Sequence, residues 1–196
     1  MIYPATYDIT ILQNSTWRAS LRATDSRQAL DSVAVVSGAA TFIKTCHGRE
    51  AGDKVVFTTA SGATVPCGLS LNEVYFVIAS GLTGDAFKVS ATLSGSEISP
   101  SGTASGQYYA ASPVNLSGYT IDADITGILD NAQVATFVCT TPTPEDGEVL
   151  MTLAPSVSSG IAEGRYNYDV SFTASGGDRY YWLTGTATVQ RTYSRN

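Results

Sequence analysis

The sequence is poor in charged residues, in histidine and in the spacing of apolar residues that marks helices. Only 14% of its 196 residues are Asp, Glu, Lys or Arg, and it has a single histidine. Apolar residues do not recur at sustained helical spacing, and no apolar run approaches the ~20 residues of a membrane span. Because the net charge is -6, a nucleic-acid partner is not expected either. The chain is therefore predicted to be all-β, without nucleic acid or membrane as partner.

The chain also lacks the short motifs of common enzymes. No GxSxG, Walker A or HExxH pattern occurs in it. His47 directly follows Cys46, and neighbours on a strand point to opposite faces, so the two cannot form a nucleophile–base pair without a bulge. We expect a turn or structural role for His47, no catalytic residue, no cofactor and no enzymatic activity.

Cysteine is scarce as well, with three residues at Cys46, Cys67 and Cys139. Their spacing fits neither a CxxC metal site nor a disulfide-dense scaffold. Residues 1–4 have no features of a signal peptide, and a protein made in the cytoplasm normally keeps its thiols reduced. Three thiols are therefore favoured, with Cys139 as a small core residue. A disulfide between Cys46 and Cys67 stays open as the alternative.

What the sequence does contain is alternation of polar and apolar residues with a period of two, clearest in residues 163–190. Side chains spaced in this way share one face of a strand. Between two such runs lies Ser175–Asp178, whose glycines tolerate the positive φ of a tight turn. This predicts a β-hairpin with one buried face. The residues expected to point inward are Tyr166, Tyr168, Val170 and Phe172 on its first strand, and Tyr181, Leu183, Gly185, Ala187 and Val189 on its second.

Shorter alternating runs predict further strands along the whole chain. They are expected at residues 7–12, 17–23, 40–45, 54–59, 73–79, 86–90, 107–110, 119–125, 134–140 and 147–153, with a helical turn at 155–161. Within 37–112 the strands follow one another about every ten residues through glycine-bearing turns, which is typical of a small barrel or sandwich. We therefore predict two domains, namely 1–36 with 113–196, and an inserted small β domain at 37–112.

Two groups of side chains are candidate sites. Asp122 and Asp124 share one face of a predicted strand, which suits paired carboxylates or calcium, although a solvated face explains them as well and no metal ligand is assigned. Tyr180, Tyr181 and Trp182 are consecutive, so at least one ring must point away from the core. An exposed ring can anchor a protein interface or stack on a sugar. Tyr180 and Trp182 are the candidate interface residues, with a partly buried edge strand as the alternative.

Negative charge is concentrated near the end of the chain. Residues 113–196 hold four Arg against nine Asp and Glu, a net charge of -5. A solvated face accounts for this charge, and an electrostatic docking surface is the alternative.

Three separate segments carry a resemblance. They are Ile11-Leu12-Gln13-Asn14-Ser15-Thr16-Trp17, then Pro113-Val114-Asn115-Leu116-Ser117-Gly118-Tyr119-Thr120, and finally Gly164-Arg165-Tyr166-Asn167-Tyr168-Asp169-Val170 with Leu183-Thr184-Gly185. Together they resemble the N-terminal domain of phage baseplate upper proteins. Members of that family have an immunoglobulin-like β-sandwich and join tail or baseplate parts. In them the first two strands lead almost directly into the second of these segments, whereas this chain places residues 37–112 between.

The inserted stretch has a resemblance of its own. It contains His47-Gly48 and Gly52-Asp53, followed by Tyr75-Phe76-Val77-Ile78-Ala79-Ser80-Gly81-Leu82 and Phe87-Lys88-Val89-Ser90. In this pattern it is similar to a small β module of phage tail-fibre proteins. The expected fold is thus an immunoglobulin-like β-sandwich interrupted by a second, small β-barrel or sandwich domain.

The two resemblances imply a structural virion protein of a tailed bacteriophage. It would be a tail or baseplate component that mediates assembly or the attachment of tail fibres, with other tail and baseplate proteins as partners. A homo-oligomer in a symmetric assembly is expected, located in the virion after synthesis in the host cytoplasm. The alternatives are a host-glycan-binding module of the tail and a capsid decoration protein.

Overall fold

The protein is built almost entirely of β-strands, as predicted. A computed structural model describes residues 5–25, 27–36, 39–64, 68–99 and 103–192. In these residues the only helical elements are the 3-10 turn η1 (Pro144–Asp146) and the four-residue α1 (Pro155–Ser158), and no helix is long and apolar enough to cross a membrane. The chain divides into two compact units: the first unit holds residues 1–23 and 115–196, and the second unit holds residues 24–114. Each unit has its own sheets.

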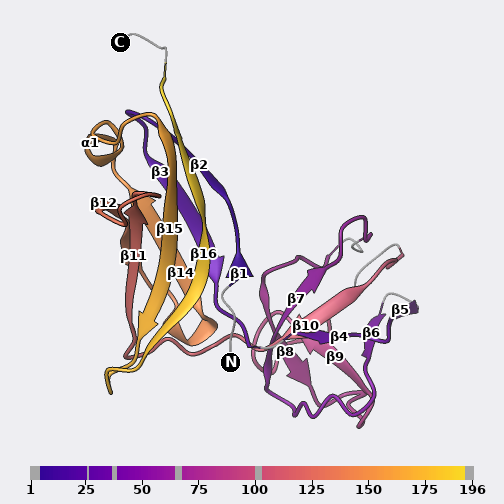
Figure 1. Cartoon of the computed structure of the whole chain (residues 1–196). Coiled ribbons are helices and arrows are strands. Elements are labelled where there is room, and N and C mark those ends of the chain that lie inside the picture. The colour runs from indigo at the N-terminus through magenta and orange to yellow at the C-terminus, as the bar shows by residue number, and fades with distance from the viewer. Residues whose placement is uncertain (1–4, 26, 37–38, 65–67, 100–102, 193–196) are drawn as a thin grey trace. The chain divides into compact units, whose positions relative to one another are not determined.

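The first unit is organised around the predicted hairpin, formed by β15 (Gly164–Thr173) and β16 (Arg179–Gln190) and drawn in orange and yellow in Figure 1. Its turn uses Gly177 at a φ of 90°, a conformation that glycine adopts without strain. On β15 the side chains of Tyr168, Val170 and Phe172 are buried as expected from their alternation. The two strands and the turn of the hairpin are confirmed, whereas Tyr166, expected to point inward, is only partly buried, and Ser171 is fully buried.

A β-bulge changes the expected orientation at the start of β16. Val170 pairs with Leu183, but Ser171 pairs with Tyr181, so Trp182 is an extra residue in the ladder. As a result Trp182 stacks on Phe172, with ring centroids 5.2 Å apart, and Leu183 is buried next to it. Tyr181, which strict alternation placed in the core, is exposed instead. The prediction for Tyr181 was wrong because period-two counting cannot detect an inserted residue.

Seven further strands complete the two sheets of the first unit around this hairpin. One sheet has the order β1-β16-β15-β11-β12, with β2 also pairing with β16, and the other has the order β13-β14-β3. Their bounds are β1 (Ala5–Thr6), β2 (Ile9–Leu12), β3 (Trp17–Arg22), β11 (Thr120–Thr126), β12 (Gln133–Thr136), β13 (Val138–Thr140) and β14 (Glu148–Leu153). In chain order, β3, β11, β13, β14, β15 and β16 take the positions of immunoglobulin strands B, C, D, E, F and G. The first unit is therefore an immunoglobulin-like β-sandwich.

The segment predicted as one strand at 134–140 is in fact two strands in different sheets. The chain leaves the first sheet after Thr136 and joins the second sheet at Val138. Between them Phe137 is buried and bridges the two sheets, since its ring lies 5.2 Å from that of Trp17 and 6.3 Å from that of Tyr168. One uncharged segment thus forms an edge of both sheets.

The N-terminal strands lie parallel to β16, and Gly185 makes their close approach possible. The Tyr7 amide donates to the Thr184 carbonyl at 3.0 Å, and the Tyr168 hydroxyl donates to the Tyr7 carbonyl at 2.6 Å. A Cβ added at Gly185 would overlap the Tyr7 carbonyl oxygen. Position 185 therefore needs glycine for space rather than for an unusual φ.

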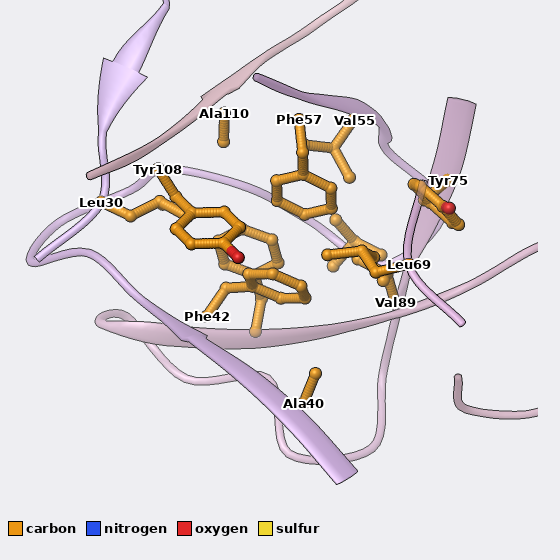
Figure 2. Packing of buried hydrophobic residues seen from close by; sticks show 12 residues of the cluster. Leu30, Ala40, Phe42, Val55, Phe57, Leu69, Tyr75, Val89, Tyr108 and Ala110 are labelled. Carbon is orange, nitrogen blue, oxygen red and sulfur yellow. The ribbon is translucent and has the colours of Figure 1, made fainter. Parts of the chain in front are cut away.

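The second unit is a single seven-stranded sheet with the order β4-β10-β7-β8-β9-β6-β5. The strands are β4 (Gln28–Ala29), β5 (Ser32–Val36), β6 (Ala39–Ile43), β7 (Lys54–Thr59), β8 (Val74–Ile78), β9 (Ala86–Ser90) and β10 (Tyr108–Ala111). Phe42, Phe57 and Phe87 stack at its centre, with the Phe42 and Phe57 centroids 4.2 Å apart (Figure 2). Because buried residues of five strands share this cluster, and partly buried valines of β5 pack against it, the sheet must curve around it.

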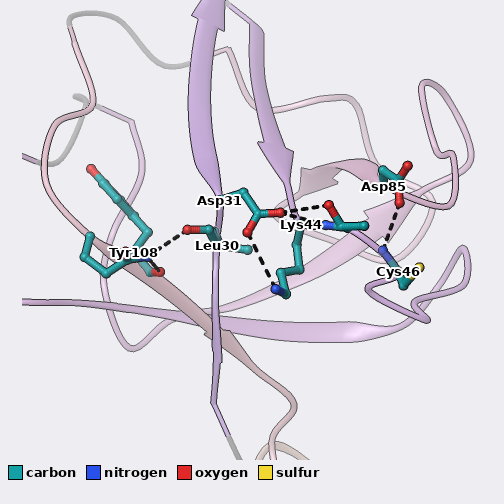
Figure 3. Close-up of polar contacts among 8 residues, drawn as sticks. Leu30, Asp31, Lys44, Cys46, Asp85 and Tyr108 are labelled. Carbon is teal, nitrogen blue, oxygen red and sulfur yellow. Dashed lines mark hydrogen bonds and ion pairs between the residues drawn. The ribbon is translucent and has the colours of Figure 1, made fainter.

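The two edge strands of this sheet are consecutive in the chain and meet at Leu30 and Asp31. The Leu30 amide donates to the Tyr108 carbonyl of β10, and the Asp31 amide donates to the Ile43 carbonyl of β6. The Asp31 carboxylate also accepts from the Thr45 amide at 2.8 Å and pairs with Lys44 (Figure 3). No ladder joins β4 to β5 in the described part of the chain, so the sheet is not a closed barrel. Its two edge strands are connected only through the chain at Leu30 and Asp31.

The boundary between the units differs from the predicted one. Residues 28–36, assigned from sequence to the sandwich, form β4 and β5 and pair with β10 and β6 of the second unit. The points where the chain enters and leaves this unit are bonded to each other. The Asp25 amide donates to the Ser112 carbonyl at 2.9 Å, and the Ser112 amide donates to the Asp25 carboxylate at 2.7 Å.

Candidate functional site

The aromatic triplet at the start of β16 divides into two exposed rings and one packed ring. Tyr180 and Tyr181 are each 49% exposed, and the Arg179 guanidinium lies 5.3 Å from the centre of the Tyr181 ring. Trp182 is only partly accessible because it stacks on Phe172. Of the two candidate interface residues, Tyr180 presents its ring to solvent, whereas Trp182 is mainly a packing residue.

The edge segment, residues 133–140, is a surface that sequence reasoning missed. It forms the outer strand of both sheets of the sandwich, and among the described residues no strand pairs with its free edge. Val138 is 65% exposed and Val134 is 40% exposed, and the preceding hairpin loop presents Leu129, which is 99% exposed. The segment carries no charge and no proline, although such residues normally protect open sheet edges.

The only histidine holds a loop of the second unit together. His47 is 5% exposed, its Nδ1 atom accepts from the Arg49 amide at 2.9 Å, and its ring packs edge-on against Phe87. Gly48 and Gly52 adopt φ values of 67° and 94°, which favour glycine. The His-Gly and Gly-Asp pairs thus lie in one loop whose conformation requires both glycines. The contacts of His47 agree with the structural role expected for it.

The cysteines differ in environment. Cys46 is an exposed free thiol whose amide donates to the Asp85 carboxylate at 2.8 Å (Figure 3). Cys139 is a half-buried free thiol, and burial raises its pKa to about 11, with smaller contributions from Asp122 and Asp124. Cys67, the other residue of the alternative disulfide with Cys46, lies outside the described residues.

The paired aspartates of β11 lie on the outer face of the first sheet. The Asp124 carboxylate accepts from the Thr136 hydroxyl and the Gln133 amide group, both at 2.8 Å. In the described residues no group of three or more His, Cys, Asp or Glu side chains could hold a metal ion. Asp124 is thus engaged in tying β12 to β11.

A shallow polar cleft of about 420 Å³ opens on the first unit and was also missed from sequence. Its lining comes from four strands and two connecting segments. Its polar side chains include those of Asp8, Thr126, Asn131, Asn167, Asp169 and Thr184. Among the described residues of the lining none is Lys, Arg or His, so this part of the polar cleft is acidic. These residues lie far apart in the sequence, and only the pairing of the strands brings them together.

Asp169 is the electrostatically unusual member of the polar cleft. Burial raises the pKa of its carboxyl and the Asp124 carboxylate raises that pKa further, while Arg179 lowers it in part. The backbone of Asp169 belongs to the ladders with β11 and β16, whereas its carboxylate makes no hydrogen bond or ion pair with another described residue. Asp8 differs from it, because its carboxylate accepts from the Thr186 amide at 2.8 Å. A partly desolvated carboxylate without a partner is typical of a position that a ligand completes.

Comparison with known proteins gives no family. No protein-family model matches the chain, and no curated protein matches it. Among solved structures it is similar to AggA, the major subunit of aggregative adherence fimbriae type I from Escherichia coli. That similarity covers 96% of this chain and 91% of the fimbrial chain, with 10% sequence identity and a TM-score of 0.21. A likeness at this level carries no argument about function.

Proposed function

We propose that the protein is a structural component of the tail or baseplate of a tailed bacteriophage, where it joins neighbouring virion proteins. The resemblance of its sequence to baseplate and tail-fibre modules suggests this location. An immunoglobulin-like sandwich with a second β unit inserted between β3 and β11 offers two separate folded surfaces on one chain. Such a chain suits a connecting role in a symmetric assembly, as a homo-oligomer bound to other tail proteins.

The observation that carries the proposal is the unprotected edge segment. Its free strand edges offer backbone donors and acceptors to a partner strand, and Val138 and Leu129 offer apolar surface beside them. An open edge without charge or proline is a liability in an isolated protein, because it pairs with other chains. Covering it in an assembly removes that liability and supplies binding energy through added strand hydrogen bonds.

The test places a charge on this surface. Val138→Asp should leave the sandwich folded, because the side chain is largely exposed, but it buries an unpaired carboxylate once a partner covers the edge. We expect incorporation into phage particles to fall about tenfold or more, measured by mass spectrometry of purified virions. Val157→Asp, at an exposed valine of α1, is the matched control and should incorporate normally. Equal incorporation of the two variants would remove the edge segment from the assembly contact.

A second candidate function rests on the exposed rings of Tyr180 and Tyr181. Aromatic faces stack on sugar rings, so these two residues suit a module that recognises host glycans. Glycan-array binding by the purified chain, lost in Tyr181→Ser, would favour this function. If phage particles incorporate Tyr181→Ser normally but no longer adsorb to host cells, the receptor-binding role would replace the assembly role.

A further inference from the structure

The polar cleft is rich in hydrogen-bond acceptors, and none of the described side chains that line it is cationic. Asp8 and Asp169 contribute carboxylates, and Asn131 and Asn167 contribute side-chain carbonyls. The side chains of Thr126, Asn131 and Asn167 make no hydrogen bond to another described residue, so their polar groups are available. The nearby Arg179 does not line the cleft; its Nε donates to the Ser171 hydroxyl at 2.9 Å and its guanidinium lies over Tyr181.

A ligand for such a cleft must bring donors and positive charge. The arginine side chain has five N–H donors in a planar fork, no acceptor and a permanent charge, and it binds carboxylates in two-point contacts. We propose that the polar cleft binds an arginine side chain of a neighbouring protein chain, with Asp169 as the carboxylate that receives its guanidinium. This inference rests on the assembly role proposed above and names the chemistry of a second contact in it.

Two other ligand classes fit less well. A sugar site normally offers an aromatic face, but the aromatic residue of the described lining is Tyr168, whose ring is buried. A divalent cation fits less well because the described lining gathers only two carboxylates, and no group of three His, Cys, Asp or Glu that could hold a metal occurs in the described residues. An arginine side chain would neutralise the negative charge of the cleft and donate hydrogen bonds to its carboxylate and carbonyl oxygens. Its binding would also relieve the repulsion between Asp169 and Asp124.

The test uses N-acetyl-L-arginine amide as probe and the ¹⁵N-labelled full chain as receptor. Titration should shift the backbone amide signals of Asn167, Asp169 and Thr184 to saturation, and molar salt should weaken the binding because it is ionic. Asp169→Asn, which keeps the side-chain shape, should weaken binding about tenfold, as expected for loss of a charge-assisted hydrogen bond. Asp178→Asn removes the same charge from the exposed turn of the hairpin, outside the cleft, and should bind like the wild type.

Each alternative result decides against the inference in its own way. Equal binding of N-acetyl-L-lysine amide would remove the assignment to a guanidinium. Saturating shifts of the same amides by methyl α-D-glucopyranoside without arginine binding would make the cleft a sugar site. Absence of saturating arginine shifts, or unchanged binding by a folded Asp169→Asn chain, would also overturn it. Because this titration needs no virions, its failure is distinct from failure of the incorporation test.

Discussion

Gly185 is the position at which the sandwich should tolerate the least change. It lies on β16 where the N-terminal strand crosses, and an added Cβ would overlap the Tyr7 carbonyl oxygen and lie 2.9 Å from Cε1 of Tyr168. The carbonyl belongs to the backbone, so the clash cannot be relieved by rotating a side chain. In Gly185→Ala the N-terminal strand must therefore move away from β16.

The cost follows from the contacts that hold this crossing. Displacement breaks three hydrogen bonds, from the Tyr7 amide, the Tyr168 hydroxyl and the Thr186 amide. Each is worth roughly 1 kcal/mol net, and a buried hydroxyl left without a partner costs a further ~1–3 kcal/mol. Alanine regains only about 0.5–1 kcal/mol over glycine in a strand. We expect Gly185→Ala to lower the free energy of unfolding of the first unit by roughly 3–5 kcal/mol.

The measurement is urea unfolding followed by tryptophan fluorescence, because both tryptophans, Trp17 and Trp182, lie in the first unit. Gly176→Ala is the control: an added Cβ there meets no atom within 4 Å, so its effect should stay within about 0.5 kcal/mol. Hydrogen exchange at the Tyr7 amide should accelerate in Gly185→Ala alone. Equal stability of the two variants would show that the close approach of Tyr7 to β16 is not part of the folded structure.

Three further outcomes are expected. Replacing residues 24–114 with a short Gly-Ser loop should leave a first unit that still unfolds cooperatively, as followed by tryptophan fluorescence. The ends of the second unit are bonded to each other, so a short loop can span the gap; loss of cooperativity would contradict the division into two units. Asp169→Asn should raise stability at neutral pH by up to about 0.5 kcal/mol. The gain should disappear in acid, because a carboxyl whose folded pKa is raised destabilises the fold fully above that pKa and not at all below its unfolded pKa; lower stability at neutral pH would refute this. Iodoacetamide at mildly alkaline pH should modify Cys46 much faster than Cys139, whose pKa is raised to about 11, as peptide mass mapping would show.

The sequence predicted the strands well wherever one face of a strand is buried. Alternation placed β8 and β14 to within one residue of their bounds, because burial on one side imposes a period of two. The short edge strands β4 and β5 were instead assigned to the sandwich, as part of residues 1–36. β4 is two residues long and its partner β10 lies far along the chain, so no local pattern marks it. β5 pairs with the next strand, β6, and was placed on the wrong side of the boundary although its partner is close in sequence.

Two of the features missed in the first unit share a physical origin. The bulge at Trp182 and the change of sheet at Phe137 each alter the register by a single residue, and alternation remains plausible on both sides. The candidate rings were found in part, because consecutive aromatics must include an exposed one, but which ring packs depends on that bulge. The polar cleft could not be predicted, since Asp8 and Asp169 meet only through the pairing of β2 and β15 with β16.

The bonded ends of the second unit have a consequence for how such proteins diversify. A stretch of coding sequence for residues 24–114 specifies a body that begins and ends at one point, between Asp25 and Ser112. Gaining, losing or exchanging that stretch in frame leaves every ladder of the sandwich continuous. The junction between β3 and β11 is thus a site where recombination can replace the second unit while the sequence of the sandwich stays the same.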